Sequence, residues 1–259
     1  MKFLSSSIFI LTLFLLFFTS CNPGYSHIKK HYDVLNNQTV FVQTVETAGP
    51  DTCTEAGLAE GEESEICGTL MTNLPTVTGR YVGTGTFIKY QGSIHVLTAE
   101  HVCNPEEFAN VLERGNITIH VKRTSEITIN SQKFFSHATI IKKNAEHDLC
   151  LLRLEEQPTK IKVAKVEKTK TRRGAEVHYA GAPYGMMSED FLLTFEGSYA
   201  GTIKEAMVFS LPCAQGASGS SIRNKKNKII SMVQRVHPEF NHVCFGVRTE
   251  HLISFLKQP

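Results

Sequence analysis

Residues 211–221 carry the clearest chemical signal in the sequence. They form a stretch rich in glycine, alanine and serine, LPCAQGASGSS. Small residues let the backbone bend sharply, so that its N–H groups can converge on a point where a hydroxyl also projects. Acyl transfer through serine needs this arrangement, with Ser218 as the nucleophile and the N–H groups of Gly216 and Ser218 as an oxyanion hole. Taken alone, the same pattern is also typical of an ordinary loop.

A serine nucleophile needs a base, and that base needs a carboxylate to orient it. Two upstream segments offer both groups. Residues 93–103 (SIHVLTAEHVC) are typical of an apolar strand, and His101 follows its end. Residues 146–154 (EHDLCLLRL) place Asp148 just before a second apolar strand. His101, Asp148 and Ser218 therefore form a candidate catalytic triad in this chain order.

This chain order, with the segment GTGTF at residues 83–87 one predicted hairpin before His101, resembles the trypsin-like (chymotrypsin-fold) serine proteases. The resemblance runs from about residue 78 to residue 256. It implies an all-β fold of two six-stranded antiparallel β-barrels with a short C-terminal helix. It also implies serine endopeptidase activity through an acyl-enzyme, with the site in the cleft between the barrels.

The bacterial and organellar branch of this family, with HtrA-like and glutamyl-endopeptidase-like proteases, is the better match. Residues 181–185 (GAPYG), 196–197 (EG), 216–219 (GASG) and 245–247 (FGV) follow the second barrel of that branch in order. Ala217 stands where digestive trypsins keep an aspartate, so their zymogen switch is not expected. An HtrA-type PDZ domain is not expected either, because the chain stops soon after the protease segment.

The strand signals fit this architecture, because runs of branched and aromatic residues bounded by polar turns are typical of an all-β barrel. The protease domain is predicted to span residues 78–259. For the first barrel, at about 78–160, strands are predicted at 83–90, 94–98, 117–123, 134–142 and 149–154. For the second, at about 174–250, strands are predicted at 176–180, 191–199, 206–211, 220–223, 229–236 and 242–248, before a helix at 252–256.

Residues 1–20 are predicted to be a signal peptide. Lys2 supplies a positive charge, and residues 8–18 form an apolar stretch too short for a comfortable membrane span. Small residues then precede Cys21, and residues 18–21 (FTSC) resemble a bacterial lipobox, in which the cysteine becomes the lipidated N-terminus. We therefore expect an exported protein, either a periplasmic or cell-envelope lipoprotein tethered through Cys21 or a secreted protein.

Residues 21–77 are predicted to form an N-terminal arm and an acidic loop. Glutamates crowd residues 55–65 between Cys53 and Cys67, although residues 40–45 alternate as a strand does. Of the seven cysteines, six remain when Cys21 is set aside, an even number that suits an oxidising compartment. Six cysteines allow fifteen pairings, and the fold analogy selects Cys53–Cys67, Cys103–Cys150 and Cys213–Cys244.

The resemblance implies a protein or peptide substrate, and the charge pattern argues against nucleic acid as a partner. The net charge is +2, and lysine and arginine are scattered along the chain. The densest run, residues 165–173, is interpreted as a solvated linker between the barrels, with contact to an anionic surface as the alternative. No Cys-x-x-Cys pair occurs, and we expect neither a metal nor another cofactor.

The resemblance also locates the substrate-binding wall, in the set Pro212, Val233, Gln234, Arg235, Gly246 and Arg248. Cleavage after lysine or arginine needs an acidic group at the pocket floor, where the motif places Pro212. Glu205 is the one acidic residue between positions 202 and 236, and it lies too far upstream. With Arg235 and Arg248 nearby, we expect small apolar or acidic residues before the scissile bond, and basic ones disfavoured.

Two other function classes remain open from the sequence. One is a catalytically inactive binding protein on the trypsin fold, and the other is a structural envelope lipoprotein. The intact histidine, aspartate, serine and glycine of the motifs favour the enzyme. Among neighbouring residues, Glu100 is predicted to face solvent, and His95 and His147 to be packed or solvated side chains rather than catalysts.

Overall fold

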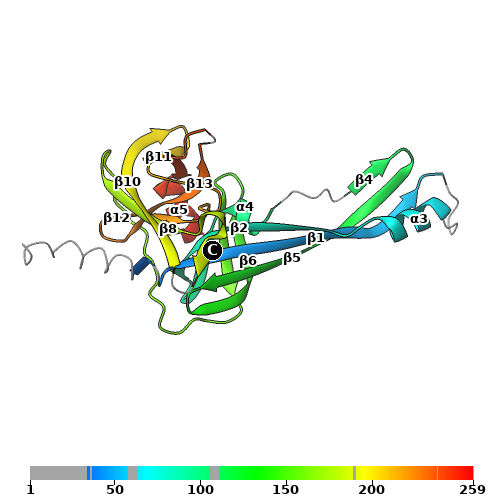
Figure 1. The fold of residues 1–259 in the computed structure, drawn as a ribbon, viewed down its shortest axis with the longest axis horizontal. Helices are drawn as coiled ribbons and strands as arrows, with labels where there is room; N and C mark the ends of the chain where they lie inside the picture. The colour runs from blue at the N-terminus through cyan, green and yellow to red at the C-terminus, as the bar shows by residue number, and fades with distance from the viewer. Residues whose placement is uncertain are drawn as a thin grey trace, which may run out of the picture.

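The computed structural model describes residues 34–35, 37–57, 64–105, 111–188, 191–237 and 239–258. Figure 1 shows two β-structured bodies, with a long extension leaving one of them. The predicted signal peptide and Cys21 lie outside the described residues. Within the described ranges, no helix has the length and apolar character needed to span a membrane.

The first barrel is closed by pairing between its first and fifth strands. Its sheet has the order β1-β2-β3-β7-β6-β5-β4, and β1 also pairs with β5, which closes all strands except β4 into a six-stranded barrel. The strands are β1 (Thr39–Glu55), β2 (Val77–Tyr90), β3 (Ser93–Thr98), β4 (Val111–Arg114), β5 (Ile117–Ser131), β6 (Phe134–Asn144) and β7 (Leu149–Leu154).

The second barrel is closed in the same way, by pairing between β10 and β11 in a sheet of order β11-β14-β13-β12-β8-β10-β9. Its strands are β8 (Glu176–Gly181), β9 (Met187–Ser188), β10 (Phe191–Ile203), β11 (Ala206–Ser210), β12 (Ser221–Asn224), β13 (Ile229–Val236) and β14 (Val243–Val247). The helix α5 (Thr249–Lys257) follows. Two six-stranded antiparallel barrels and a C-terminal helix confirm the predicted fold class.

The first barrel begins earlier than the sequence predicted. The arm predicted for residues 21–77 contains β1, which pairs along its length with β2 and β5 and is therefore a barrel strand. Val40 and Val42 are fully buried in the core. The barrel thus begins at Thr39 and not near residue 78. Its strand signal is short because the inward-facing apolar residues stop near Ala48, where β1 leaves the barrel.

Beyond the barrel, β1 and β5 continue side by side as a long two-stranded arm (Figure 1). The helix α3 (Glu65–Asn73) and β4 lie at its far end, remote from the second barrel. Ser64 caps α3 by accepting a hydrogen bond from the N–H of Cys67 (3.0 Å). The disulfide between Cys53 and Cys67 ties this helix to β1.

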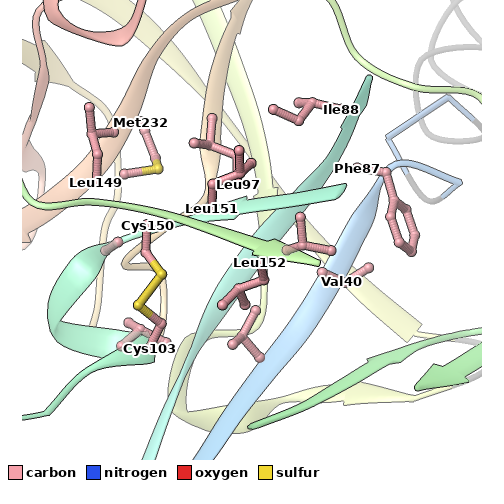
Figure 2. Packing of buried hydrophobic residues seen from close by; sticks show 14 of the residues in the cluster. Val40, Phe87, Ile88, Leu97, Cys103, Leu149, Cys150, Leu151, Leu152 and Met232 are labelled. Carbon is pink, nitrogen blue, oxygen red and sulfur yellow. A yellow bond between two sulfur atoms is a disulfide. The ribbon is translucent and has the colours of Figure 1, made fainter. Parts of the chain in front are cut away.

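One apolar cluster runs through the first barrel and reaches residues of the second. Figure 2 shows buried side chains from β1, β2, β3 and β7 together with Met232 of β13. Leu252 and Phe255 of α5 belong to the same cluster. Each fully buried side chain of this size stabilises the fold by about 1.5–3 kcal/mol relative to an exposed one. The first barrel, the C-terminal helix and a few residues of the second barrel therefore share one core, and a second apolar cluster fills the second barrel.

The three disulfides join the pairs that the fold analogy selected. Their Cα atoms lie 5.5 Å apart in Cys53–Cys67, 6.6 Å in Cys103–Cys150 and 5.8 Å in Cys213–Cys244. Cys103 follows His101 by two residues, and Cys150 follows Asp148 by two. The second disulfide, visible in Figure 2, therefore ties the segment that carries the candidate base to the segment that carries the candidate carboxylate.

Candidate active site

Neighbouring strands of the first barrel bring His101 and Asp148 together. His101 lies in the short helix α4 (Glu100–Cys103), directly after β3. Asp148 lies just before β7 with a φ of 53°, a left-handed conformation that aspartate tolerates better than most residues. Because β3 and β7 pair, with Thr98 opposite Cys150, the two side chains leave the sheet at the same edge.

The Asp148 carboxylate holds His101 by both its ring and its backbone. The Nδ1 atom of His101 lies 3.0 Å from Oδ1 and 2.9 Å from Oδ2 of Asp148. The backbone N–H of His101 donates to the same Oδ1 (3.0 Å). A carboxylate at Nδ1 favours the tautomer with its proton there and leaves Nε2 free to accept one. The His101 side chain is 51% exposed and that of Asp148 20% exposed, so Nε2 is reachable from solvent.

Opposing effects act on the pKa of His101. Desolvation is the largest effect and lowers it, whereas the hydrogen bond to Asp148, the charge of Asp148 and the charge of Glu100 raise it. Together they raise the pKa of His101 above its ordinary value of 6.5. The imidazolium form, which arises when His101 accepts a proton, is thus stabilised.

Glu100 is mostly buried, contrary to the solvent-facing position predicted for it. Its side chain is 13% exposed. Its Oε1 atom accepts a hydrogen bond from Asn104 Nδ2 (2.9 Å), and Lys143 Nζ lies 3.9 Å away. Asn104 lies one helical turn further along the chain, and Lys143 lies in β6. The Glu100 carboxylate, next to the candidate base, is therefore fixed by protein contacts and is not freely solvated.

The turn that carries Ser218 depends on two glycines in the left-handed region. Gly216 has a φ of 90° and Gly219 a φ of 85°. A Cβ atom on Gly219 would lie 2.0 Å from the carbonyl oxygen of Thr84, and one on Gly216 would lie 2.6 Å from that of Ala182. The small residues of the motif are thus required by backbone conformation and by close approach of neighbouring chain.

Thr84 of β2 holds this turn from the first barrel. Its N–H donates to the carbonyl of Ser218 (2.8 Å), and its hydroxyl donates to the carbonyl of Gly216 (2.9 Å). The N–H groups of Gly216 and Ser218 donate to no acceptor among the described residues. Both N–H groups are therefore available to an external oxygen, as an oxyanion hole requires.

The three candidate catalytic residues line one pocket of about 540 Å³. Its wall consists of His101, Ala145, Glu146, Asp148, Ala214, Gln215, Ser218, Gln234, Arg235 and Val236. The Ser218 hydroxyl donates to the carbonyl of Gln234 (3.4 Å), and among the described contacts it makes no hydrogen bond to His101. The pocket therefore gathers the triad residues, with the hydroxyl turned toward β13.

The predicted substrate-binding residues fall into two groups. Gln234 and Arg235 line the pocket, and the Arg235 guanidinium lies 5.8 Å from the centre of the Phe245 ring. The other four do not line it. Val233 is fully buried, Gly246 packs against Ser231, the carbonyl of Pro212 accepts the Tyr179 hydroxyl, and Arg248 pairs with Glu205 (3.4 Å) and Glu250 (3.8 Å).

Sequence reasoning missed the parts played by Thr84 and Glu146, and it predicted Gln234 as a substrate-binding residue without the contact that its side chain makes. The Gln234 amide donates to the carbonyl of His147 (2.8 Å), which links β13 to the loop that carries Asp148. Thr84 lies within the GTGTF segment, but nothing in that segment indicates a partner more than a hundred residues away. In the described ranges, no three His, Cys, Asp or Glu side chains are grouped to hold a metal ion.

Two solved structures share this architecture. The mutant of Rv3671c from M. tuberculosis H37Rv, which replaces a serine by alanine and is in an inactive form, superposes with a TM-score of 0.56 at 12% identity, covering 87% of this chain and 88% of that chain. The serine endoprotease from Yersinia pestis superposes with a TM-score of 0.58 at 15% identity, covering 88% of this chain and 65% of that chain. At such identities these structures show a shared fold.

None of the curated proteins compared matches the sequence. The family model of the trypsin-like peptidase domain matches residues 83–232, from the GTGTF segment through the nucleophile turn to β13. The match includes His101, Asp148 and Ser218 and covers more than half of the 259 residues. The chain therefore belongs to the trypsin-like peptidase domain family.

Proposed function

We propose that the protein is a serine endopeptidase that hydrolyses peptide bonds through an acyl-enzyme. The observation that carries this proposal is the single pocket that the hydrogen-bonded pair of His101 and Asp148 lines together with Ser218. In the turn that carries Ser218, the N–H groups of Gly216 and Ser218 have no acceptor among the described residues. Family membership supports the reaction class, and the geometry supports a role for each residue.

The reaction begins when the Ser218 hydroxyl turns from the carbonyl of Gln234 toward Nε2 of His101. His101 accepts the hydroxyl proton while Oγ attacks the scissile carbonyl carbon, and the N–H groups of Gly216 and Ser218 bind the resulting oxyanion. The tetrahedral adduct collapses, His101 gives its proton to the leaving amine, and the acyl-enzyme remains. Water then attacks by the same steps and releases the acid and the free serine. Asp148 keeps His101 oriented and stabilises the imidazolium throughout.

We propose that the pocket prefers small apolar or acidic residues before the scissile bond. Arg235 is exposed on β13, the strand whose Gln234 carbonyl accepts the Ser218 hydroxyl, and it lines the pocket, with its guanidinium 5.8 Å from the centre of the Phe245 ring. A cation there repels lysine and arginine side chains and pairs with carboxylates. Glu146 also lines the pocket, from the segment just before Asp148, whereas Arg248 is engaged with Glu205 outside it.

We also propose that the protein is exported, with a signal peptide at residues 1–20 and a lipid tether on Cys21. Three disulfides are consistent with an oxidising compartment. The alternative is secretion without an anchor. In either case the peptidase acts outside the cytoplasm on protein or peptide substrates.

The nucleophile is tested with a fluorophosphonate probe that reacts with activated serines. We expect the wild type to be labelled and the Ser218→Ala variant to be unlabelled, because the reacting oxygen is gone. The matched control is Ser220→Ala, which removes a buried hydroxyl two residues away without touching the pocket. Peptide hydrolysis is expected to fall by about 10³–10⁶-fold in Ser218→Ala and in His101→Ala. A folded wild type that is not labelled would instead favour an inactive binding protein.

The base is tested through the pH dependence of kcat/KM. His101 must be neutral to accept the proton, so activity rises with pH through the pKa of His101, which Asp148 and Glu100 raise above 6.5. Removing a charge that raises this pKa lowers it, so Glu100→Gln is expected to move the midpoint to lower pH and keep most of the maximal rate. Asp148→Asn is expected to reduce the maximal rate by about 10⁴-fold, because it favours the wrong tautomer. An unchanged midpoint in Glu100→Gln would contradict this account.

Specificity is tested with a library of peptide substrates that vary the residue before the cut. We expect small apolar and acidic residues to be cleaved best and arginine poorly. Replacing Arg235 by glutamine is expected to reduce discrimination against arginine, because the repelling cation leaves the pocket. Arg248→Gln is the matched control and is expected to keep the wild-type profile, since Arg248 does not line the pocket. Efficient cleavage after arginine by the wild type would refute the proposed preference.

The lipid tether is tested by fractionation of cells that express the full chain. Cys21→Ser is expected to move the protein from the membrane fraction to the soluble exported fraction, because the acylated atom is lost. The Ser218→Ala variant keeps Cys21 and serves as the control for an inactive but tethered protein. The same partition in Cys21→Ser and in the wild type would exclude the lipid anchor and leave secretion as the explanation.

A further inference from the structure

Arg223 of β12 is a buried guanidinium with no carboxylate beside it. Its side chain is fully buried, and desolvation lowers its pKa to about 10. None of the ion pairs among the described residues includes it, and one of its terminal nitrogens, Nη2, has no hydrogen-bond partner there. Burying a charge is unfavourable unless the charge is paired and hydrogen-bonded, so the partners of the remaining donors matter.

The other two side-chain nitrogens of Arg223 donate to residues that are themselves hydrogen-bonded to the first barrel. Its Nε donates to the hydroxyl oxygen of Ser221 (2.9 Å), which also accepts a hydrogen bond from the Thr86 hydroxyl of β2 (2.9 Å). Its Nη1 donates to the side-chain carbonyl of Gln38. The backbone carbonyl of Gln38 in turn accepts from the N–H of Phe87 (2.9 Å). Arg223 is thus connected to β2 twice, through Ser221 and through Gln38.

The hydrogen bonds that connect Arg223 to β2 involve residues close in sequence to the nucleophile turn and to Thr84. Ser221 follows Ser218 by three residues, and Thr86 follows Thr84, the residue that holds the turn, by two. Alternate residues of a strand share a face, so Thr84 and Thr86 both point toward the second barrel. Ala217, the residue before the nucleophile, is fully buried and carries no charge that could anchor the turn. Within the second barrel the turn is held by hydrogen bonds to Val233 of β13, whereas the contacts that reach it from the first barrel come from Thr84 of β2. Arg223 is connected to this same strand.

We infer that Arg223 and Gln38 form a clamp that positions Ser218 relative to His101. This inference rests on the proposed function. His101 and Asp148 belong to the first barrel and Ser218 to the second, so the reacting geometry depends on how the barrels are held. Apolar packing between the barrels is non-directional, whereas hydrogen bonds fix a register. Arg223 is a positioning residue, and Gln38, just before β1, makes the start of the first barrel part of the positioning.

The test is the double variant Gln38→Leu/Arg223→Met, which removes both partners and leaves no unpaired charge. Replacing a buried polar pair by apolar residues of similar size commonly preserves or raises stability. We expect a melting temperature equal to or above that of the wild type, with kcat per active site reduced at least about tenfold and KM little changed. The midpoint of the pH profile is expected to stay in place, because His101 and Asp148 both lie in the first barrel.

Two further variants separate positioning from general stability. Glu46→Leu/Arg123→Met removes a second, partly buried guanidinium pair, which joins β1 to β5 and in which Arg123 also donates to the carbonyl of Pro105 (2.9 Å). Its kcat is expected to equal that of the wild type. Gln38→Glu keeps an acceptor for Arg223 and is expected to retain wild-type kcat. A clamp variant with unchanged kcat, or a control variant that loses as much, would overturn the inference.

Hydrogen exchange tests the clamp without any need for activity. The N–H groups of Ala217, Gly219 and Ser220 are hydrogen-bonded within or beside the turn. We expect them to exchange faster in the Gln38→Leu/Arg223→Met variant and at the wild-type rate in the Glu46→Leu/Arg123→Met variant. If the wild type does not react with fluorophosphonate, the proposed function fails while this measurement still decides the clamp. Equal exchange in both variants would show that Arg223 does not hold the turn.

Discussion

The hydrogen bonds from Thr84 to the nucleophile turn are the contacts on which the candidate site depends. The first barrel supplies His101 and Asp148, the second supplies Ser218, and the apolar core that the barrels share has no directional preference. Thr84 binds the carbonyls of Ser218 and Gly216 across this boundary. Each such bond contributes only about 0.5–1.5 kcal/mol, a small part of the stability of the fold. Their importance lies in direction, because they set where the hydroxyl lies relative to the imidazole.

The same contacts explain why the turn contains small residues. Thr84 can hold the turn only if its carbonyl lies close enough to Gly219 that a side chain there would collide with it. The small residues of the motif are therefore needed for two reasons: the turn itself bends sharply, and β2 packs closely against it. The sequence indicates the bend directly. The approaching strand becomes visible only when β2 and the turn are placed together.

Short motifs made the core of the site predictable, because they place a reactive residue next to the end of a strand. Each strand of a barrel has only two neighbours, so residues at matching ends of paired strands must lie close together. His101 and Asp148 follow this logic. Three features did not, because contacts outside the motifs override the local pattern. The strand β1 has a polar outer half because it leaves the barrel. Glu100 accepts a hydrogen bond from Asn104 with Lys143 alongside, and Arg248 pairs with Glu205 outside the pocket.

The arm formed by β1 and β5 has a consequence for how the molecule can vary. Its two strands are continuous with barrel strands, but only the barrel half of β1 has fully buried side chains such as Val40 and Val42. The inward alternation in that half fixes the register for the whole ladder, since a one-residue slip would turn these valines outward. Lengthening both arm strands by matched pairs of residues leaves this register intact. Because the disulfide ties α3 to β1 and only residues 74–76 separate α3 from β2, a longer arm leaves β2 and the nucleophile turn in place only if this connection lengthens as well.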